Sequence, residues 1–133
     1  MGAIHLTYDQ HVAVVTIEDA ERYNAMSLSM WIVLGRAFEE IDQHPDARVV
    51  ILRGAGERAF VSGANISEFD TQRTSDAAVA HYNQSVAKAQ EAITRCRVPV
   101  IAAISGICYG GGLGLALSCD LRYASPSAKF RMP

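Results

Sequence analysis

The sequence predicts an α/β fold in which crossover helices cover a mostly parallel sheet. Short runs of apolar, β-branched residues, typical of buried strands, recur along the chain. Longer segments with apolar residues at helical spacing separate these runs, which favours parallel strands joined by right-handed crossovers. The length of 133 residues, with 50% hydrophobic and 20% charged residues, suits one globular domain.

The first half of the chain contains two predicted strands of the sheet and a hairpin partner. Residues 11–18 are apolar on both faces, and residues 4–8 precede them across the turn Asp9-Gln10. Residues 48–53 form a second buried strand, which leads into a loop of small residues over 54–65. We therefore expect the sheet to begin with an antiparallel hairpin and to continue in parallel.

Two long helices are predicted between the strands. The first is capped by Ser27 or Ser29 and runs to about Gln43, just before a proline. The second is capped by Ser75 and runs to about Cys96. Each carries apolar residues on one face: Trp31, Leu34, Phe38 and Ile41 on the first, and Ala78, Tyr82, Val86, Ala89 and Ile93 on the second.

The last third of the chain repeats the alternation of strands and helices. A third strand spans residues 99–104, and a glycine turn and a short helix follow it. Further strands are predicted over 120–124 and 129–132, on either side of the turn Ser125-Pro126-Ser127. Because the chain stops as the last strand begins, we expect residues 1–133 to be the N-terminal portion of a longer domain.

The most informative segment spans residues 104–116, where a strand leads through three consecutive glycines, 110–112, into an apolar helical segment. Two interpretations are open. Glycines at this junction let another group approach the backbone, and the free N–H groups of the first helical turn can then hold a negatively charged oxygen. Alternatively, the glycines only let the helix and the sheet pack closely.

A second loop, residues 59–66, follows the second strand. Ligands gather at the carboxyl ends of parallel strands, so both loops are expected at one edge of the sheet. Two backbone N–H groups, one from each loop, could then share one oxygen and form an oxyanion hole. Residues 54–59 also fit a relaxed G-x-G-x-x-A dinucleotide fingerprint, but a β- and turn-like stretch follows where that motif requires a helix.

Composition disfavours several other functions. The formal net charge of −2 gives no reason to expect nucleic acid or an anionic membrane as a partner. No apolar run has the length of a membrane span and no secretory signal is visible, which favours the cytoplasm. The scattered histidines give no metal-ligand pattern. Cys96, Cys108 and Cys119 are expected to be buried, reduced thiols, and a catalytic Cys108 is disfavoured because no histidine is near it in the sequence.

Three segments resemble successive signatures of the enoyl-CoA hydratase/isomerase (crotonase) superfamily: Asn24-Ala25-Met26-Ser27, residues 59–66 and residues 104–120. They occur in the family's order and at fitting separations over almost the whole chain. The resemblance implies a crotonase-like ββα spiral, with residues 1–133 as the N-terminal portion of a single domain. It also implies self-association as a trimer or a dimer of trimers.

The resemblance assigns a role to two backbone amides. Ala64 and Gly111 match the residues whose N–H groups bind the thioester carbonyl oxygen of an acyl-CoA and stabilise its enolate. No separate cofactor and no metal are implied, because coenzyme A enters as part of the substrate. Arg22 is a candidate for the CoA phosphates or, equally, a solvated surface arginine. The full set of implied substrate and CoA contacts is Arg22, Ser62, Ala64, Asn65, Ile66, Gly110 and Gly111.

The chain departs from the hydratases at their acid/base groups. Hydratases carry one glutamate three positions after the middle glycine, where this chain has Gly114, and the position of the second falls beyond Pro133. Two carboxylates usually share the addition of water, so that scheme cannot operate unaltered here. The other polar candidates are Glu68 and Asp70 after the oxyanion loop, as acyl-pocket groups or solvated loop carboxylates, Tyr109 as a hydrogen-bond donor or a packed tyrosine, and Asp120 as a structural residue.

The leading interpretation is a cytoplasmic acyl-CoA enzyme that stabilises a thioester enolate. Its reaction would differ from two-glutamate hydration, which leaves isomerisation, decarboxylation, hydrolysis and hydration by relocated groups open. Gly114 favours an alternative, a non-catalytic acyl-CoA-binding paralogue. A further alternative is an inactive fragment whose acyl pocket is incomplete.

Overall fold

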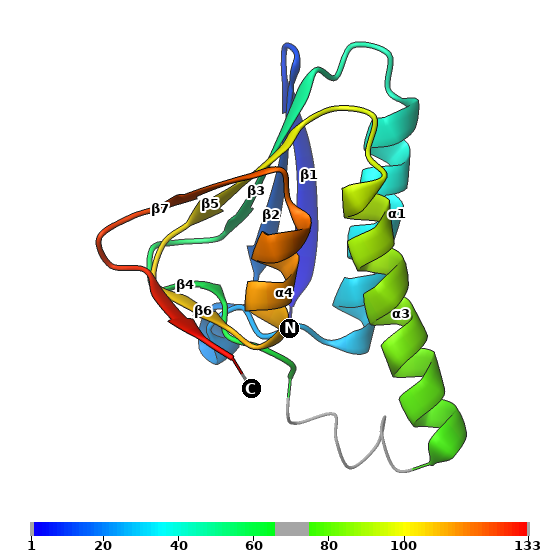
Figure 1. Ribbon diagram of the computed structural model, residues 1–133, viewed down its shortest axis with the longest axis vertical. Coiled ribbons are helices and arrows are strands. Elements are labelled where there is room, and N and C mark those ends of the chain that lie inside the picture. Colours follow the sequence, from blue (N-terminus) through cyan, green and yellow to red (C-terminus); the bar gives the residue numbers. More distant parts are fainter. Residues whose placement is uncertain (1, 66–74, 133) are drawn as a thin grey trace.

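The computed structural model describes residues 2–65 and 75–132, which form two sheets and their covering helices (Figure 1). The larger sheet has five strands in the order β1-β2-β3-β5-β7, and the smaller has three in the order β4-β6-β8. The strands are β1 (Ala3–Asp9), β2 (Val12–Glu18), β3 (Val49–Gly54), β4 (Ala59–Val61), β5 (Val100–Ile104), β6 (Ile107–Tyr109), β7 (Leu121–Ala124) and β8 (Lys129–Arg131).

The larger sheet begins with the predicted hairpin. β1 and β2 pair antiparallel, with Asp9 opposite Val12, and the intervening Gln10 has a φ of 54°. β2 then pairs in parallel with β3, β3 with β5, and β5 with β7. Every other residue of β2 from Ala13 to Ile17 is fully buried. The expectation of an antiparallel start and a parallel continuation is therefore confirmed.

A ββα unit then repeats along the chain. β3, β4 and α3 (Asp76–Thr94) form one unit, and β5, β6 and α4 (Gly111–Ser118) form the next, while β7 and β8 begin a third. In each unit the first strand joins the larger sheet and the second joins the smaller. This repetition confirms the expected ββα spiral.

The smaller sheet itself was not predicted. β4 lies inside the segment we expected to be a loop, and β6 lies inside the expected glycine turn. Both strands have three residues, and their partners are tens of residues away in the sequence: Val61 pairs with Cys108, and Cys108 with Phe130. Of the three strands in this sheet, the sequence predicted only β8, whereas β4 and β6 are defined by their non-local pairing.

Both long helices begin at the predicted caps. α1 (Leu28–Gln43) has Ser27 as its N-cap, whose Oγ accepts a hydrogen bond from the Met30 N–H at 3.2 Å. In α3 the Ser75 Oγ accepts from the Ala78 N–H at 3.0 Å. α3 ends at Thr94, slightly before the predicted end at Cys96. A short 3₁₀ turn, η1 (Ala20–Arg22), precedes α1.

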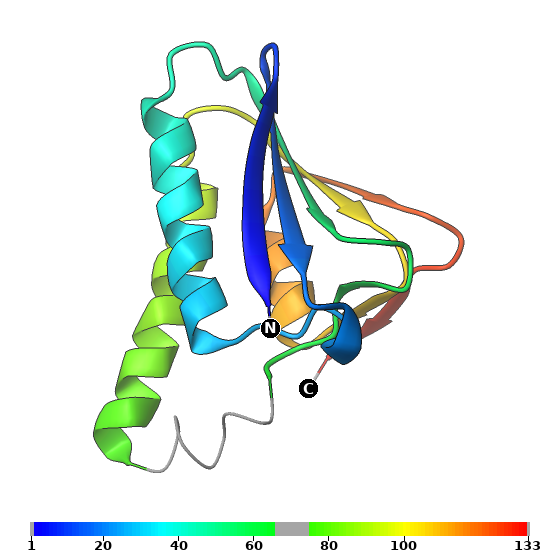
Figure 2. The ribbon, with the colours of Figure 1, turned by 180° about the vertical axis from the view of Figure 1, so that it is seen from behind.

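α1 and α3 lie side by side, as the two opposite views show (Figures 1 and 2), and α1 packs against β1 while α3 packs against α4. Gly35 permits a close approach, since a Cβ there would lie 3.6 Å from the Cα of Ala89. The indole N–H of Trp31 donates to the Tyr82 hydroxyl at 3.1 Å across the same interface. All four residues of the predicted α1 stripe, Trp31, Leu34, Phe38 and Ile41, are buried.

Candidate active site

The structure brings the two predicted loops together through the smaller sheet. β4 and β6 run parallel, with Val61 opposite Cys108. The two predicted amides each lie three residues after this pair: Ala64 follows Val61 on the first loop, and Gly111 follows Cys108 on the second. The loops are in contact, since a Cβ built on Gly63 would lie 3.9 Å from the Tyr109 carbonyl oxygen.

The Ala64 amide is oriented by a bridge to the segment before α1. The Gly63 carbonyl accepts a hydrogen bond from the Met26 N–H at 2.7 Å, and the Asn65 N–H donates to the Met26 carbonyl at 2.8 Å. In a trans peptide the C=O and N–H point in opposite directions, so the Ala64 N–H points away from Met26. It has no hydrogen-bond acceptor among residues 2–65 and 75–132.

The Gly111 amide is oriented by a helix. The Gly110 carbonyl accepts from the Gly114 N–H at 3.1 Å inside α4, so the Gly111 N–H on the same peptide points out of the helix N-terminus. Gly110 itself donates to the Arg131 carbonyl at 2.9 Å. The Gly111 N–H has no acceptor within the described part of the chain, and the helix dipole favours a negative charge in front of it.

The three glycines have different surroundings, and close packing of the helix against the sheet, one of the two interpretations, is confirmed at Gly112. Gly110 has φ 54° and ψ −115°, a conformation that side chains rarely adopt. Gly112 is the packing residue, because a Cβ there would overlap with the Val61 carbonyl oxygen. Gly111 lies over the Trp31 ring, which would be 3.2 Å from its Cβ. Close packing of Gly112 thus holds the free amide of Gly111 in place.

Asn24 anchors the first loop from the family-like signature that precedes α1. Its side chain is buried, its Oδ1 accepts from the Asp19 N–H at 2.9 Å, and its Nδ2 donates to the Ala59 carbonyl at 2.9 Å. Nδ2 is also 3.2 Å from the Ala55 carbonyl oxygen. The role of Asn24 is therefore to fix the geometry of the chain next to the loop.

The predicted CoA contacts are only partly brought together. The Ser62 hydroxyl donates to the Arg22 carbonyl at 3.0 Å, so these two residues are adjacent. The Arg22 side chain is half-exposed, and its guanidinium lies 3.8 Å from the buried Asp19 carboxylate. Asn65 lies next to Ala64 and is tied to Met26 by its backbone. Ile66 lies outside the described residues.

The sequence analysis did not identify Arg58, which lies near Asn24 and Tyr23. The Arg58 guanidinium stacks on the Tyr23 ring at 4.5 Å from its centroid and donates to the Tyr23 hydroxyl at 2.5 Å. The pair lines a hollow of about 270 Å³ beside Asn24. Nothing in the spacing of Tyr23 and Arg58 predicted this pairing, which depends on the fold of the loop between β3 and β4.

The polar candidates differ in their surroundings. The Asp120 carboxylate accepts from the Val100 N–H at 2.7 Å, which confirms its expected structural role. Tyr109 is half-buried, and its hydroxyl has no hydrogen-bond partner among the described residues. Glu68 and Asp70 lie outside the described residues. At Gly114, a Cβ would lie 2.9 Å from the Nε2 of Gln90 on α3.

The cysteines are poorly suited to nucleophilic chemistry. Burial raises the pKa of Cys108 to about 11 and that of Cys119 to about 12, so both remain thiols near neutral pH. Burial also raises the pKa of Cys96. Cys108 and Cys119 are buried as expected, but Cys96, which follows the end of α3, is only half-buried.

Two other predicted or possible sites lie elsewhere. Residues 54–59 lead into β4 and not into a helix, which agrees with the rejection of a dinucleotide site.

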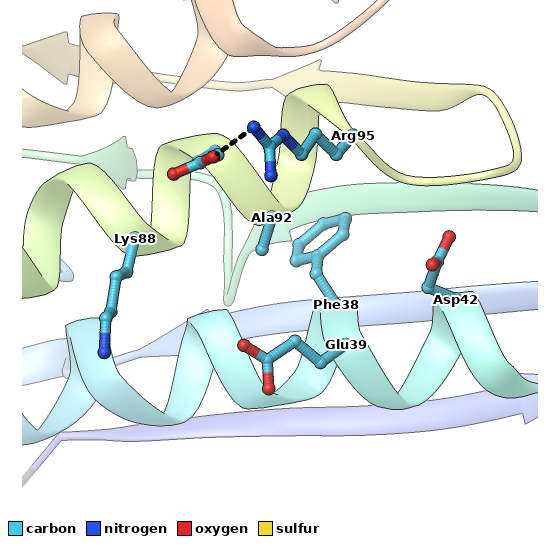
Figure 3. Close-up of a pocket in the computed structure, with 7 residues that line it drawn as sticks. Phe38, Glu39, Asp42, Lys88, Ala92 and Arg95 are labelled. Carbon is cyan, nitrogen blue, oxygen red and sulfur yellow. Dashed lines mark ion pairs between the residues drawn. The ribbon is translucent and has the colours of Figure 1, made fainter.

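A groove of about 330 Å³ lies between α1 and α3, where Phe38, Glu39 and Lys88 project toward it (Figure 3). No cluster of three possible metal ligands occurs in the described ranges. No described helix is long and apolar enough to cross a membrane.

Comparison with known proteins identifies the class that this fold and these loops define. The family model described as Enoyl-CoA hydratase/isomerase matches residues 7–133. The chain therefore belongs to the enoyl-CoA hydratase/isomerase family.

Individual relatives agree with this assignment. The chain is 36% identical, over 92% of its length, to the peroxisomal Delta(3,5)-Delta(2,4)-dienoyl-CoA isomerase of Arabidopsis thaliana. It is 37% identical, over its whole length, to the short-chain-enoyl-CoA hydratase of Clostridium acetobutylicum. It covers 47% and 50% of these two relatives, and so spans about half of their length.

A solved structure has the same fold over the same extent. The enoyl-CoA hydratase/carnithine racemase of Magnetospirillum magneticum superposes with a TM-score of 0.95 at 45% identity. The superposition covers all of this chain and 50% of that structure. The predicted crotonase-like fold is thus confirmed for the part of the chain that the structure describes.

Proposed function

We propose that this protein processes acyl-CoA thioesters, and that the backbone amides of Ala64 and Gly111 hold the thioester carbonyl oxygen. One observation carries the proposal: two free N–H groups, each preceded by a positive-φ glycine, lie on adjacent loops that leave paired parallel strands. The names of the relatives, which include an enoyl-CoA hydratase and a dienoyl-CoA isomerase, support acyl-CoA as the substrate class.

The chemistry follows from where negative charge develops. When a proton leaves the α-carbon, or a nucleophile adds to the conjugated double bond, the thioester oxygen gains charge as an enolate. Fixed amide donors bind this charged oxygen more tightly than the neutral carbonyl of the substrate, which lowers the barrier. Loss of one such donor typically reduces the rate by a factor on the order of 10²–10³.

We further propose that the acid/base step differs from two-glutamate hydration. Gly114 provides no side chain at the position where hydratases, by resemblance, carry their first glutamate. Isomerisation, decarboxylation, hydrolysis and hydration by other groups all place negative charge on the thioester oxygen, which the two amides would hold, while groups other than residue 114 carry the proton transfers. Hydration of crotonyl-CoA should accordingly be slow, and a turnover number in the usual enzyme range of about 1–10³ per second would contradict this assignment of Gly114.

The test is a turnover screen of enoyl-, dienoyl-, 3-hydroxyacyl- and saturated acyl-CoA thioesters, followed by Ala64→Pro on the best substrate. Proline removes the N–H donor, so kcat/KM should fall by about 10²–10³ while the circular dichroism spectrum is retained. Ala64→Ser keeps the amide and should lose far less activity. Near-normal turnover in a folded Ala64→Pro variant would contradict the role of this amide.

A second candidate function is acyl-CoA binding without turnover, which the absence of a carboxylate at Gly114 favours. The same screen separates the two. Binding of thioesters by calorimetry together with no turnover of any of them would support the binding paralogue. If the protein neither binds nor turns over any thioester, and a longer natural form is also inactive, the acyl-CoA proposal is wrong. If the longer form is active, residues 1–133 alone are an inactive fragment.

The CoA moiety is proposed to lie along Arg22, Ser62, Asn65, Ile66 and Gly110. The adjacency of Arg22 and Ser62 supports this path. Arg22→Gln should weaken binding of free CoA more at low salt than at high salt, because the contact with a phosphate is electrostatic. We also propose, from the resemblance, a trimeric or hexameric assembly in the cytoplasm, which light scattering and cell fractionation would check.

A further inference from the structure

Gly114 has a specific neighbour on another helix. A Cβ built on Gly114 would lie 2.9 Å from the Nε2 of Gln90, so the terminal amide of Gln90 lies against the bare backbone of α4 at this position. α3 and α4 are in direct contact. The absence of a side chain at residue 114 thus leaves space that a carboxamide from α3 now occupies.

Gln90 lies on the inner side of α3. It is one turn after Val86, which packs against the core, and it is next to the buried Ala89. Lys88 and Arg95, which line the outer groove, project from a different side of the same helix. Gln90 as a whole residue is half-buried, and its carboxamide has no hydrogen-bond partner within the described part of the chain.

The position relative to the free amide is also informative. Gly114 is three residues after Gly111 on α4, which corresponds to a rise of about 4.5 Å and a rotation of about 60° around the helix axis. A polar atom beside Gly114 is therefore roughly one helical turn from the donor proposed to hold the thioester oxygen. An oxygen on the third carbon of an acyl chain is separated from the thioester carbonyl carbon by a single carbon, so a group one helical turn from the Gly111 amide is placed to meet it.

We infer that Gln90 is a specificity-determining residue, whose free carboxamide donates a hydrogen bond to an oxygen substituent near the third carbon of the acyl group. The inference rests on the proposed acyl-CoA function and names the kind of acyl group that the site selects. A carboxamide is neutral and neither gives up nor takes up a proton near neutral pH. Gln90 therefore recognises an oxygen acceptor without replacing a glutamate as an acid or a base.

The test compares two thioesters that differ by one carbonyl oxygen, acetoacetyl-CoA and butyryl-CoA, in calorimetric titrations of the intact protein. In Gln90→Leu, affinity for acetoacetyl-CoA should fall about fivefold to tenfold, the contribution of one neutral hydrogen bond. Affinity for butyryl-CoA should change less than about twofold. Gln90→Glu replaces the donor with a negative charge and should reduce acetoacetyl-CoA binding further. Gln84→Leu, on an exposed position of the same helix, is the matched control and should bind both ligands like the wild type.

The outcomes separate the two levels of the account. If the wild-type protein binds both thioesters and Gln90→Leu weakens them equally or not at all, the role of Gln90 is wrong and the acyl-CoA function stands. If the wild-type protein binds neither thioester, the proposed function fails and the role of Gln90 fails with it. Retained selectivity in a folded Gln90→Glu variant would also overturn the inference.

Discussion

The two amide-bearing loops occupy the same place in successive ββα units but are fixed in different ways. Ala64 follows β4 and Gly111 follows β6, and each comes directly after a glycine with positive φ. The first loop remains extended and bonds to Met26, which is distant in the sequence. The second turns at once into α4.

This difference shows which parts of the molecule each amide depends on. The first amide depends on a long-range hydrogen-bond network that includes Asn24 and Met26. The second depends on local backbone conformation and on the close fit of Gly112 against Val61. Substitutions far from the first loop should therefore disturb it, whereas the second should respond to changes in volume within α4.

The largest expected effect on stability is at the second loop. In Gly112→Ala the new methyl group overlaps with the Val61 backbone, and the free energy of unfolding should fall by about 3 kcal/mol. Gly114→Ala is the matched control, because its methyl group meets only the flexible end of Gln90 and gains helix propensity. Its stability should change by less than about 1 kcal/mol in urea denaturation. Equal losses in both variants would contradict the packing role of Gly112.

The next effect tests the long-range support of the first loop. Asn24→Ala leaves the Asp19 N–H and the Ala59 carbonyl without their buried partner, which should cost about 2 kcal/mol. Hydrogen exchange should increase around residues 62–65 more than around α4. Asn83→Ala, at an exposed position of α3, is the control and should be close to neutral. Uniform protection of both loops in Asn24→Ala would remove the distinction between them.

A smaller effect concerns the two glycines that precede the amides. Gly63 has φ 127° and Gly110 has φ 54° with ψ −115°. A Cβ at Gly63 would make only an ordinary contact with the Tyr109 carbonyl oxygen at 3.9 Å, and one at Gly110 would meet nothing within 4 Å. Alanine at either position should cost about 1.5 kcal/mol through backbone strain alone. Gly56, with φ 72° and open space around it, should cost less on replacement, about 1 kcal/mol. Thermal melts would rank the three variants.

The smallest effect under ordinary conditions is a pH dependence at the second loop. Burial raises the pKa of Cys108 from 9.0 to about 11, so the folded state holds a proton that the unfolded state releases. The resulting stability is fully present below pH 9 and is lost as the pH rises toward 11. In Cys108→Ala the decline of the free energy of unfolding between pH 9 and 11 should be shallower. An unchanged slope would contradict this assignment.

Local signals in the sequence were sufficient to predict the hairpin, the two long helices and the approximate bounds of most strands of the larger sheet. Ser27 and Ser75 cap their helices through their own hydroxyl groups, which depends on residues within one turn. The second loop was equally visible, because three adjacent glycines lie between an apolar strand and an apolar helical segment.

The remaining features depend on contacts between distant residues. β4 and β6 have three residues each and exist through their mutual pairing, which no local pattern encodes. The Ala64 amide is aimed by Met26, and the carboxamide beside Gly114 comes from another helix. The sequence could therefore indicate the two amides through family resemblance, but not their support or the place of Gln90.

The central claim is that the Ala64 and Gly111 amides hold one thioester oxygen, and infrared spectroscopy of a bound ¹³C-labelled acyl-CoA tests it directly. Hydrogen bonds weaken the C=O bond, so binding to the wild-type protein should lower its stretching frequency. Proline is tolerated at the first position of a helix, so Gly111→Pro removes that N–H while α4 persists, and Gly111→Ala is its control. In Ala64→Pro and in Gly111→Pro, the frequency of the bound carbonyl should rise part of the way back to that of free acyl-CoA. In the double variant it should return almost completely. A carbonyl frequency that is the same in the wild type and in all three folded variants would contradict the claim.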